Sequence, residues 1–181
     1  PMKIYTKKGD DGTTGLLYGG RVPKDSPLPT AYGEVDEAQA VLGMARAEVE
    51  RGGELDTLLI GLERDLWVLM AELATSPEHR ARLAPGTSLV TEEMVLALEA
   101  HIDEVSERFE LPTEFVVPGE NRISATLDLG RTVVRRAERH ALSAVEDGSQ
   151  VVPYLNRLSD LLWALARWQG GGSLTAREDA T

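Results

Sequence analysis

Residues 55–75, LDTLLIGLERDLWVLMAELAT, decide the fold class of this 181-residue chain. Their leucines recur at the spacings of three and four residues that gather side chains on one broad face of an α-helix. The residues on that face are Leu55, Leu58, Leu59, Leu62, Leu66, Leu69 and Leu73. A helix with so wide an apolar face buries it against other elements, and Pro77 follows as a stop signal.

Four further helices are predicted around this one. Ala31, Val35 and Ala38 begin a run of alternating four- and three-residue spacings that is typical of a helix-bundle seam. Thr91 is a suitable N-cap for a later helix, and Pro153 suits the first turn of the last one. The predicted helices cover about residues 29–51, 55–75, 91–109, 121–144 and 153–169. With almost no strand signal, the pattern predicts an all-α, five-helix up-and-down bundle.

The remaining segments predict a single domain over residues 1–169, with irregular parts around the helices. Residues 1–30 are rich in glycine and proline and are expected to be a loop. Residues 76–88 are expected to be a loop as well, and residues 115–117 a short extended segment between two prolines. The polar, Gly-rich residues 170–181 predict a disordered tail.

Composition restricts the classes of partner. The formal net charge is -11, so the surface repels nucleic acid and anionic lipid, and neither is expected as a partner. The chain has no cysteine, which excludes disulfides, thiolate metal sites and a cysteine nucleophile. Neither a signal peptide nor a membrane span is recognisable, so a cytoplasmic protein is expected.

The N-terminal segment carries a first candidate site in residues 6–15, TKKGDDGTTG. Its glycines allow a ligand to approach the backbone N–H groups, and its lysines and hydroxyls suit phosphate. The acids could reach Mg²⁺ directly or through water. The spacing is not that of a Walker A loop, and a flexible terminal turn is the competing interpretation. The candidate ligand-binding residues are Thr6, Lys7, Lys8, Gly9, Asp10, Gly12, Thr14 and Gly15, with Lys24 as a further cation.

A row of arginines marks the fourth predicted helix, in the sequence RTVVRRAER at residues 131–139. Arg131, Arg135 and Arg139 are four residues apart and therefore stack along one face. Arginine forks suit a polyphosphate through bidentate hydrogen bonds. The alternative is a solvated face whose arginines form ion pairs with Asp128 and Glu138.

A third candidate lies in residues 154–160, YLNRLSD, at the start of the fifth helix. Asn156 could hydrogen-bond a ribose or a phosphate, whereas helix capping and a polar contact to the fourth helix form the structural alternative. A di-iron centre, which bundles can also hold, is excluded because no histidine has a glutamate three residues before it.

Together these segments resemble the PduO-type ATP:corrinoid adenosyltransferases from about Tyr5 to Trp168. The segments that carry the resemblance are YTKKGDDGTTGL, AYGEVDEAQAVLG, FVVPG, RTVVRRAER and YLNRLSDLLW, in this order. The resemblance implies a homotrimer of ferritin-like five-helix bundles with active sites at subunit interfaces. It also implies transfer of the 5′-deoxyadenosyl group of ATP to the cobalt of reduced cob(I)alamin or a related corrinoid. Triphosphate is released, Mg²⁺ is bound, and a reductase and an adenosylcobalamin-dependent acceptor enzyme are the implied protein partners.

The resemblance also assigns roles to residues. The implied ATP contacts are Thr6, Lys7, Lys8, Gly9, Thr14, Gly15, Lys24, Arg135, Arg136, Glu138, Arg139 and Asn156. Asp36 and Arg131 match an intersubunit salt bridge, and with Arg135 they are the expected catalytic residues. Phe115 matches an aromatic residue beneath the corrin ring, where it would exclude the lower axial ligand of Co(II) and raise its reduction potential. From composition alone, a core phenylalanine is the alternative.

Some positions depart from the pattern of the family. Glu120 and Asn121 stand where glycine and small residues are usual, Asp128 where histidine is common, and Gly130 where alanine is usual. Asp11 is acidic where a basic residue is frequent. The departures leave the ATP residues intact and bear on corrinoid binding. Two alternatives to the active transferase therefore remain, an ATP- and corrinoid-binding carrier or sensor without turnover, and a structural trimer without ligand.

Overall fold

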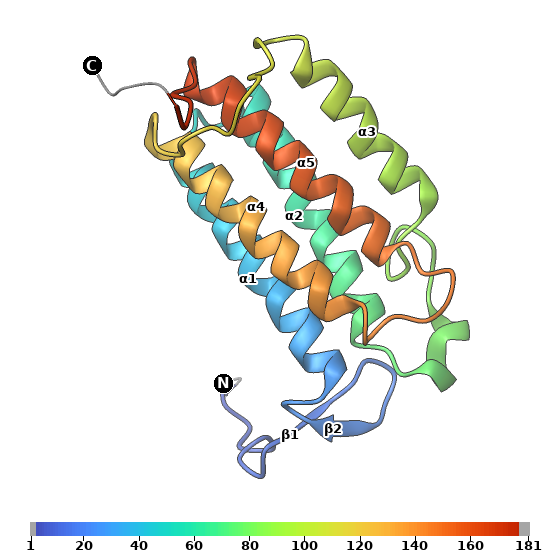
Figure 1. The fold of residues 1–181 in the computed structure, drawn as a ribbon. Coiled ribbons are helices and arrows are strands. Elements are labelled where there is room, and N and C mark those ends of the chain that lie inside the picture. The colour runs from blue at the N-terminus through green and yellow to red at the C-terminus, as the bar shows by residue number, and fades with distance from the viewer. Residues whose placement is uncertain (1–2, 178–181) are drawn as a thin grey trace.

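The computed structural model describes residues 3–177, in which five long helices run alternately up and down (Figure 1). The helices are α1 Pro27–Ala47, α2 Glu54–Leu73, α3 Glu92–Ser106, α4 Arg122–Ala141 and α5 Val151–Gly170. The other elements are the strands β1 Thr13–Gly15 and β2 Arg21–Pro23 and the 3₁₀ helix η1 Pro77–Arg82. The five-helix prediction is confirmed, with helix ends that differ from the expected ones by a few residues.

The core lies mainly between α1, α2, α4 and α5, and α3 contributes Val95, Leu98 and Val105 to it. Helix α4 packs against both α1 and α5, α2 packs against α1, and α3 packs against the outer side of α5. The apolar face predicted for α2 is buried at every leucine except Leu58, which is partly buried. Helix α3 stands apart from α2, and a hollow of about 500 Å³ lies between them. Among the described residues, no helix has the length and apolar character needed to cross a membrane.

Polar side chains cap the N-termini of α3 and α4. Thr91 accepts a hydrogen bond from the backbone N–H of Met94 at 3.3 Å and caps α3, as the sequence predicts. Asn121 forms a reciprocal capping box with Ser124 at the start of α4. The Asn121 side chain also donates to the Gln169 carbonyl at 2.7 Å, which fastens the start of α4 to the end of α5.

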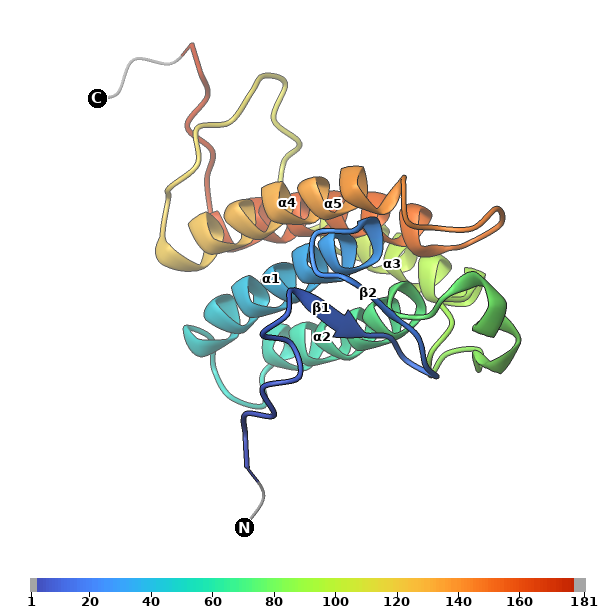
Figure 2. The ribbon, with the colours of Figure 1, turned by 90° about the horizontal axis from the view of Figure 1, so that it is seen from below.

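The N-terminal segment is more regular than the loop predicted for residues 1–30. Strands β1 and β2 pair antiparallel, with Thr14 opposite Val22, and the hairpin lies across one end of the bundle (Figure 2). The Leu17 N–H donates to the Ala74 carbonyl at 2.8 Å, so the hairpin is tied to the end of α2. Strands of three residues are too short to show alternating hydrophobicity, which is why sequence patterns missed them.

The segment after α5 also differs from its prediction as a disordered tail. Gly171, with a φ of 73°, ends the helix in the left-handed conformation that favours glycine. The chain then runs beside the extended segment that contains Phe115. The Val117 N–H donates to the Leu174 carbonyl at 2.8 Å, and the Ala176 N–H donates to the Phe115 carbonyl at 2.9 Å. Residues 178–181 of the predicted tail lie outside the described residues.

Candidate active site

The glycine-rich N-terminal loop is held in shape by Arg21 of β2. The Arg21 Nη2 group donates to the Lys8 carbonyl at 2.8 Å and to the Thr13 hydroxyl at 2.9 Å. Asp11 accepts hydrogen bonds from the Thr13 hydroxyl and backbone N–H, and these bonds lower the pKa of the Asp11 carboxyl. Sequence reasoning did not single out Arg21, because its role depends on the strand pairing that brings it beside Thr13.

Lys24 lies close over Gly9, so a larger residue at that position would displace the lysine and crowd the Thr13 carbonyl. A Cβ atom at Gly9 would lie 2.9 Å from the Lys24 ammonium nitrogen and 3.3 Å from the Thr13 carbonyl oxygen. The Lys24 N–H donates to the Gly12 carbonyl at 2.9 Å. Lys7 adopts a φ of 62°, a conformation that is costly outside glycine and is concentrated at functional sites. The structure therefore brings Lys24 together with the loop, as the sequence analysis expected.

Along α4 the arginines fall into two groups. Arg135 and Arg139 are exposed, and neither forms an ion pair with any carboxylate among residues 3–177. Arg136 donates to Glu34 at 2.5 Å and also pairs with Glu37, and these hydrogen bonds raise the pKa of Arg136. The predicted stacking leaves two guanidinium groups facing solvent with their hydrogen-bonding capacity available to an anion.

Asn156 lies beside the arginine row, on α5. Its side-chain nitrogen is 3.3 Å from a carboxylate oxygen of Glu138, and its side-chain oxygen accepts from Arg157 at 2.5 Å. The polar contact between α5 and α4 that was the structural alternative for Asn156 is therefore present. Glu138 binds this amide and forms no ion pair with an arginine within residues 3–177.

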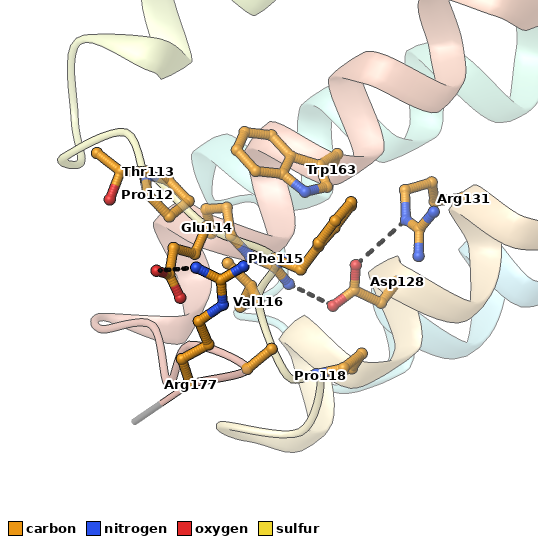
Figure 3. Close-up of a pocket in the computed structure, with 12 residues that line it drawn as sticks. Pro112, Thr113, Glu114, Phe115, Val116, Pro118, Asp128, Arg131, Trp163 and Arg177 are labelled. Atoms are coloured by element: carbon orange, nitrogen blue, oxygen red, sulfur yellow. Dashed lines mark hydrogen bonds and ion pairs between the residues drawn. The ribbon is translucent and has the colours of Figure 1, made fainter. Parts of the chain in front are cut away.

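A second part of the candidate site surrounds Phe115, whose side chain points into a cavity of about 650 Å³ (Figure 3). Phe115 is 89% exposed, so the alternative of a core phenylalanine is wrong. The cavity wall comes from the loop before α4, from α4 and α5, and from the segment after α5. Its lining includes Pro112, Glu114, Phe115, Pro118, Asp128, Arg131, Trp163, Arg167 and Arg177.

Buried charge lies along one side of the Phe115 cavity. Asp128 and Arg167 are 4% and 6% exposed and form an ion pair between α4 and α5. Arg131 also reaches Asp128, at 3.4 Å, so the ion pair with Asp128 that was the structural alternative for the arginine row is present at Arg131. Sequence reasoning missed Arg167 and Trp163. The available signal was a single arginine within the apolar run LLWALARW. An arginine on a buried helix face needs a carboxylate partner, so its presence there could have indicated a buried ion pair.

The loop and the cavity are separated within one chain. The N-terminal hairpin lies at the end of the bundle where α4 finishes, whereas the Phe115 segment lies at the end where α4 begins (Figures 1 and 2). Within the described part of the chain, no hydrogen bond or ion pair joins residues 6–15 or Lys24 to Arg135, Arg136 or Arg139. Asp36 is exposed on α1 and has no partner among the same residues, so its expected pairing with Arg131 does not occur within the chain.

The carboxylates of the candidate site suit a Mg²⁺ ion that is also bound by the phosphates of a substrate. No group of three or more His, Asp or Glu side chains within residues 3–177 is arranged to hold a metal. Mg²⁺ is commonly bound by one or two carboxylates together with substrate phosphates and water. Asp10 and Glu138 are carboxylates of the loop and of the arginine helix that are compatible with such binding.

Comparison with known proteins identifies the family. Residues 4–169 match the family model described as cobalamin adenosyltransferase. The chain is 38% identical over 188 residues to a corrinoid adenosyltransferase of Mycobacterium tuberculosis (strain ATCC 25618 / H37Rv), covering 96% of each. It is 36% identical over 172 residues to a corrinoid adenosyltransferase of Bacillus subtilis (strain 168), covering 92% of this chain and 86% of the relative. A structure of a PduO-type ATP:corrinoid adenosyltransferase variant from Lactobacillus reuteri, complexed with cobalamin and ATP, matches with a TM-score of 0.85 at 30% identity and 97% coverage of both chains. This chain therefore belongs to the cobalamin adenosyltransferase family.

Proposed function

We propose that the protein transfers the 5′-deoxyadenosyl group of ATP to the cobalt of cob(I)alamin or a related corrinoid and releases triphosphate. One observation carries the proposal most directly. In a chain of net charge -11, Arg135 and Arg139 stay exposed without a carboxylate partner in the described residues. Lys7, Lys8 and Lys24 of the loop likewise form no ion pair there. Cations that remain unpaired in so acidic a chain are suited to a polyphosphate.

The reaction is a displacement at the C5′ carbon of ATP. The lone pair of Co(I) forms the cobalt–carbon bond while the C5′–oxygen bond breaks, and the triphosphate leaves with that electron pair. Arg135 and Arg139 stabilise the negative charge that grows on the leaving group, and the loop lysines bind the phosphates. The N–H groups of the loop hold the chain of phosphates in line, so positioning lowers the barrier further. Bound Mg²⁺ would neutralise part of the phosphate charge.

The cavity around Phe115 is the proposed place for the corrin ring. Phe115 lies in the segment between Pro112 and Pro118, its side chain is exposed, and its backbone carbonyl accepts a hydrogen bond from the Ala176 N–H. An apolar side chain below the cobalt occupies the space that water or a base would need as lower ligand. Removal of that ligand makes Co(II) easier to reduce, which supplies the nucleophilic Co(I).

We also propose that the protein forms a homotrimer whose active sites are shared between neighbouring copies. The nucleotide loop and the Phe115 cavity lie at opposite ends of one bundle, so a complete site needs the loop of one copy and the cavity of another. Arg131 binds Asp128 through Nε, which leaves its Nη groups available to Asp36 of a neighbouring copy. Light scattering at micromolar concentration is expected to give the mass of three chains. A monomeric mass would contradict the shared site.

The departures from the family pattern at Glu120, Asn121 and Asp128 do not favour the carrier or sensor alternative, because these three side chains have structural partners here. Asn121 caps α4, Glu120 accepts from the Leu174 N–H at 3.3 Å, and Asp128 binds Arg167. An active transferase needs a supply of Co(I) and a consumer of its product. We therefore expect a reductase and an adenosylcobalamin-dependent enzyme as partners, in the ATP-containing, reducing cytoplasm.

The decisive experiment mixes the protein with ATP, Mg²⁺ and chemically reduced cobalamin under anaerobic conditions. The expected result is conversion of the cob(I)alamin spectrum to that of adenosylcobalamin, with one triphosphate released for each cobalamin converted. Omission of ATP serves as the control. Binding of both ligands without conversion would replace the transferase by the carrier or sensor alternative.

A further inference from the structure

The carboxylate of Asp128 divides its two oxygens between arginines of different helices. Oδ1 accepts from the Nε of Arg131, three residues later on α4, at 3.4 Å. Oδ2 accepts from the Nη2 of Arg167, which reaches across from α5. All three side chains line the Phe115 cavity (Figure 3). Asp128 is thus the only acid in contact with either arginine among the described residues.

Burial makes this arrangement sensitive to charge. The side chains of Asp128 and Arg167 are each 5% exposed, whereas that of Arg131 is 29% exposed. Two guanidinium groups this close to each other repel strongly in a poorly solvated place unless a carboxylate lies between them. Arg167 also lies over the ring of Trp163, with 5.6 Å between its guanidinium carbon and the ring centroid, which fixes it from a second side.

The other acid of the cavity is already engaged. Glu114 pairs with Arg177 at 3.5 Å, and both side chains belong to segments that flank the opening. Arg131 lines the cavity with Nη groups that have no partner within residues 3–177, because Asp128 contacts only its Nε group. The guanidinium is rigid and planar, so the contact at Nε restrains the direction in which those Nη groups point.

We propose that Asp128 is a positioning residue for the corrinoid, which orients the guanidinium of Arg131 at the cavity wall beside Phe115 while Arg167 holds the other carboxylate oxygen from α5. Asp128 touches neither substrate in this arrangement and acts through Arg131. The inference rests on the proposed function, since it takes the Phe115 cavity as the corrinoid site. It gives the departure at Asp128 a specific role in that site.

Three variants separate positioning from simple support of the fold. Asp128→Asn keeps the size of the side chain and removes its charge, which leaves Arg167 buried without a counterion and lowers thermal stability. Asp128→Asn combined with Arg167→Gln has no uncompensated buried charge, so stability is expected to recover. Arg131 remains without its anchor in both variants. We expect the KM for cobalamin to rise roughly tenfold in both, because a charge-assisted hydrogen bond is lost, while the KM for ATP stays near the wild-type value.

The third variant places Asp128→Asn in an Arg131→Met background. If Asp128 acts through Arg131, the substitution at Asp128 has no further effect on the cobalamin KM there, as a double-mutant cycle measures. Recovery of the cobalamin KM together with stability in the Asp128→Asn, Arg167→Gln protein would overturn the proposal. So would an equal effect of Asp128→Asn with and without Arg131.

A second readout keeps this test distinct from the test of the transferase activity. Equilibrium binding of Co(II) cobalamin in the presence of ATP, followed by the absorption change of the cobalt, needs no turnover. Asp128→Asn is expected to weaken that binding by the same factor as it raises the KM. If the wild-type protein binds Co(II) cobalamin but never adenosylates it, the proposed function fails while the role of Asp128 is still decided. If Asp128→Asn binds Co(II) cobalamin as tightly as wild type, the positioning role is wrong.

Discussion

Replacement of Phe115 by alanine tests whether the cavity serves cobalt chemistry or the fold. Phe115 is 89% exposed, so only about a tenth of the roughly 200 Å² that a phenylalanine can bury is covered. Those roughly 20 Å² contribute about 0.5 kcal/mol at about 25 cal/mol per Å². A fully buried phenylalanine would lose about 3–5 kcal/mol on the same change. The structure therefore predicts that Phe115→Ala shifts Tm by only about 1–2 °C in a chain of this size.

The functional effect should depend on the oxidation state of the cobalt supplied. Starting from chemically prepared cob(I)alamin, Phe115→Ala is expected to retain most of its adenosylation rate, since the ATP residues are untouched. Starting from Co(II) and a reductant, it should lose most activity, because water or a base can now occupy the lower position. Binding of ATP, measured by calorimetry, provides the control. Early melting, or equal loss from both starting states, would refute the role assigned to Phe115.

Four further substitutions test other parts of the structure. Arg135→Ala should lower kcat about 100-fold or more with unchanged Tm, because an exposed leaving-group contact is lost, and near-normal turnover at saturating substrates would contradict this. Arg21→Met should raise the KM for ATP roughly tenfold and leave the cobalamin KM unchanged, since the loop loses charged hydrogen bonds to Lys8 and Thr13. Gly130→Ala should stabilise α4 by about 1 kcal/mol in thermal unfolding, because a Cβ there meets its nearest neighbours at an ordinary 3.5 Å. Burial raises the pKa of Asp65, so the unfolded chain loses this proton first and the contribution of Asp65 to stability falls as pH rises past 3.8. Asp65→Asn has no carboxyl to ionise, so its stability relative to wild type should increase from acidic to neutral pH. Urea unfolding at several pH values measures this difference, and a difference that does not change with pH would contradict the raised pKa of Asp65.

Features encoded in local patterns could be predicted from the sequence. The leucine stripe of α2 and the cap at Thr91 depend on neighbours within a few residues, and the structure contains both. The pairing of Arg136 with Glu34 could not be predicted, because it joins residues 102 positions apart. Partner choice at such a distance is decided by helix packing, which a single sequence does not specify.

Within the candidate site as well, features set by residues close in sequence could be predicted, whereas contacts between distant residues could not. Glycines and cations marked the N-terminal loop correctly as a unit that includes Lys24, because they are close in sequence. The role of Arg21 required the hairpin, and the Asp128–Arg167 pair required the crossing of α4 and α5. The exposure of Phe115 depends on the pairing of residues 115–117 with the segment after α5, which composition alone had marked as disordered.

The outer position of α3 has a consequence for how the molecule opens. Helix α3 packs against α5 alone among the principal helix contacts, with the hollow to α2 on its other side. Helix α3 therefore has less packing around it than α1, α4 and α5, although Val95, Leu98 and Val105 are buried, and its amide hydrogens should exchange with solvent before those of these three helices. The chain leads from α3 directly into the segment that carries Phe115. Opening of α3 would thus loosen the attachment of the Phe115 segment, which forms part of the wall of the Phe115 cavity.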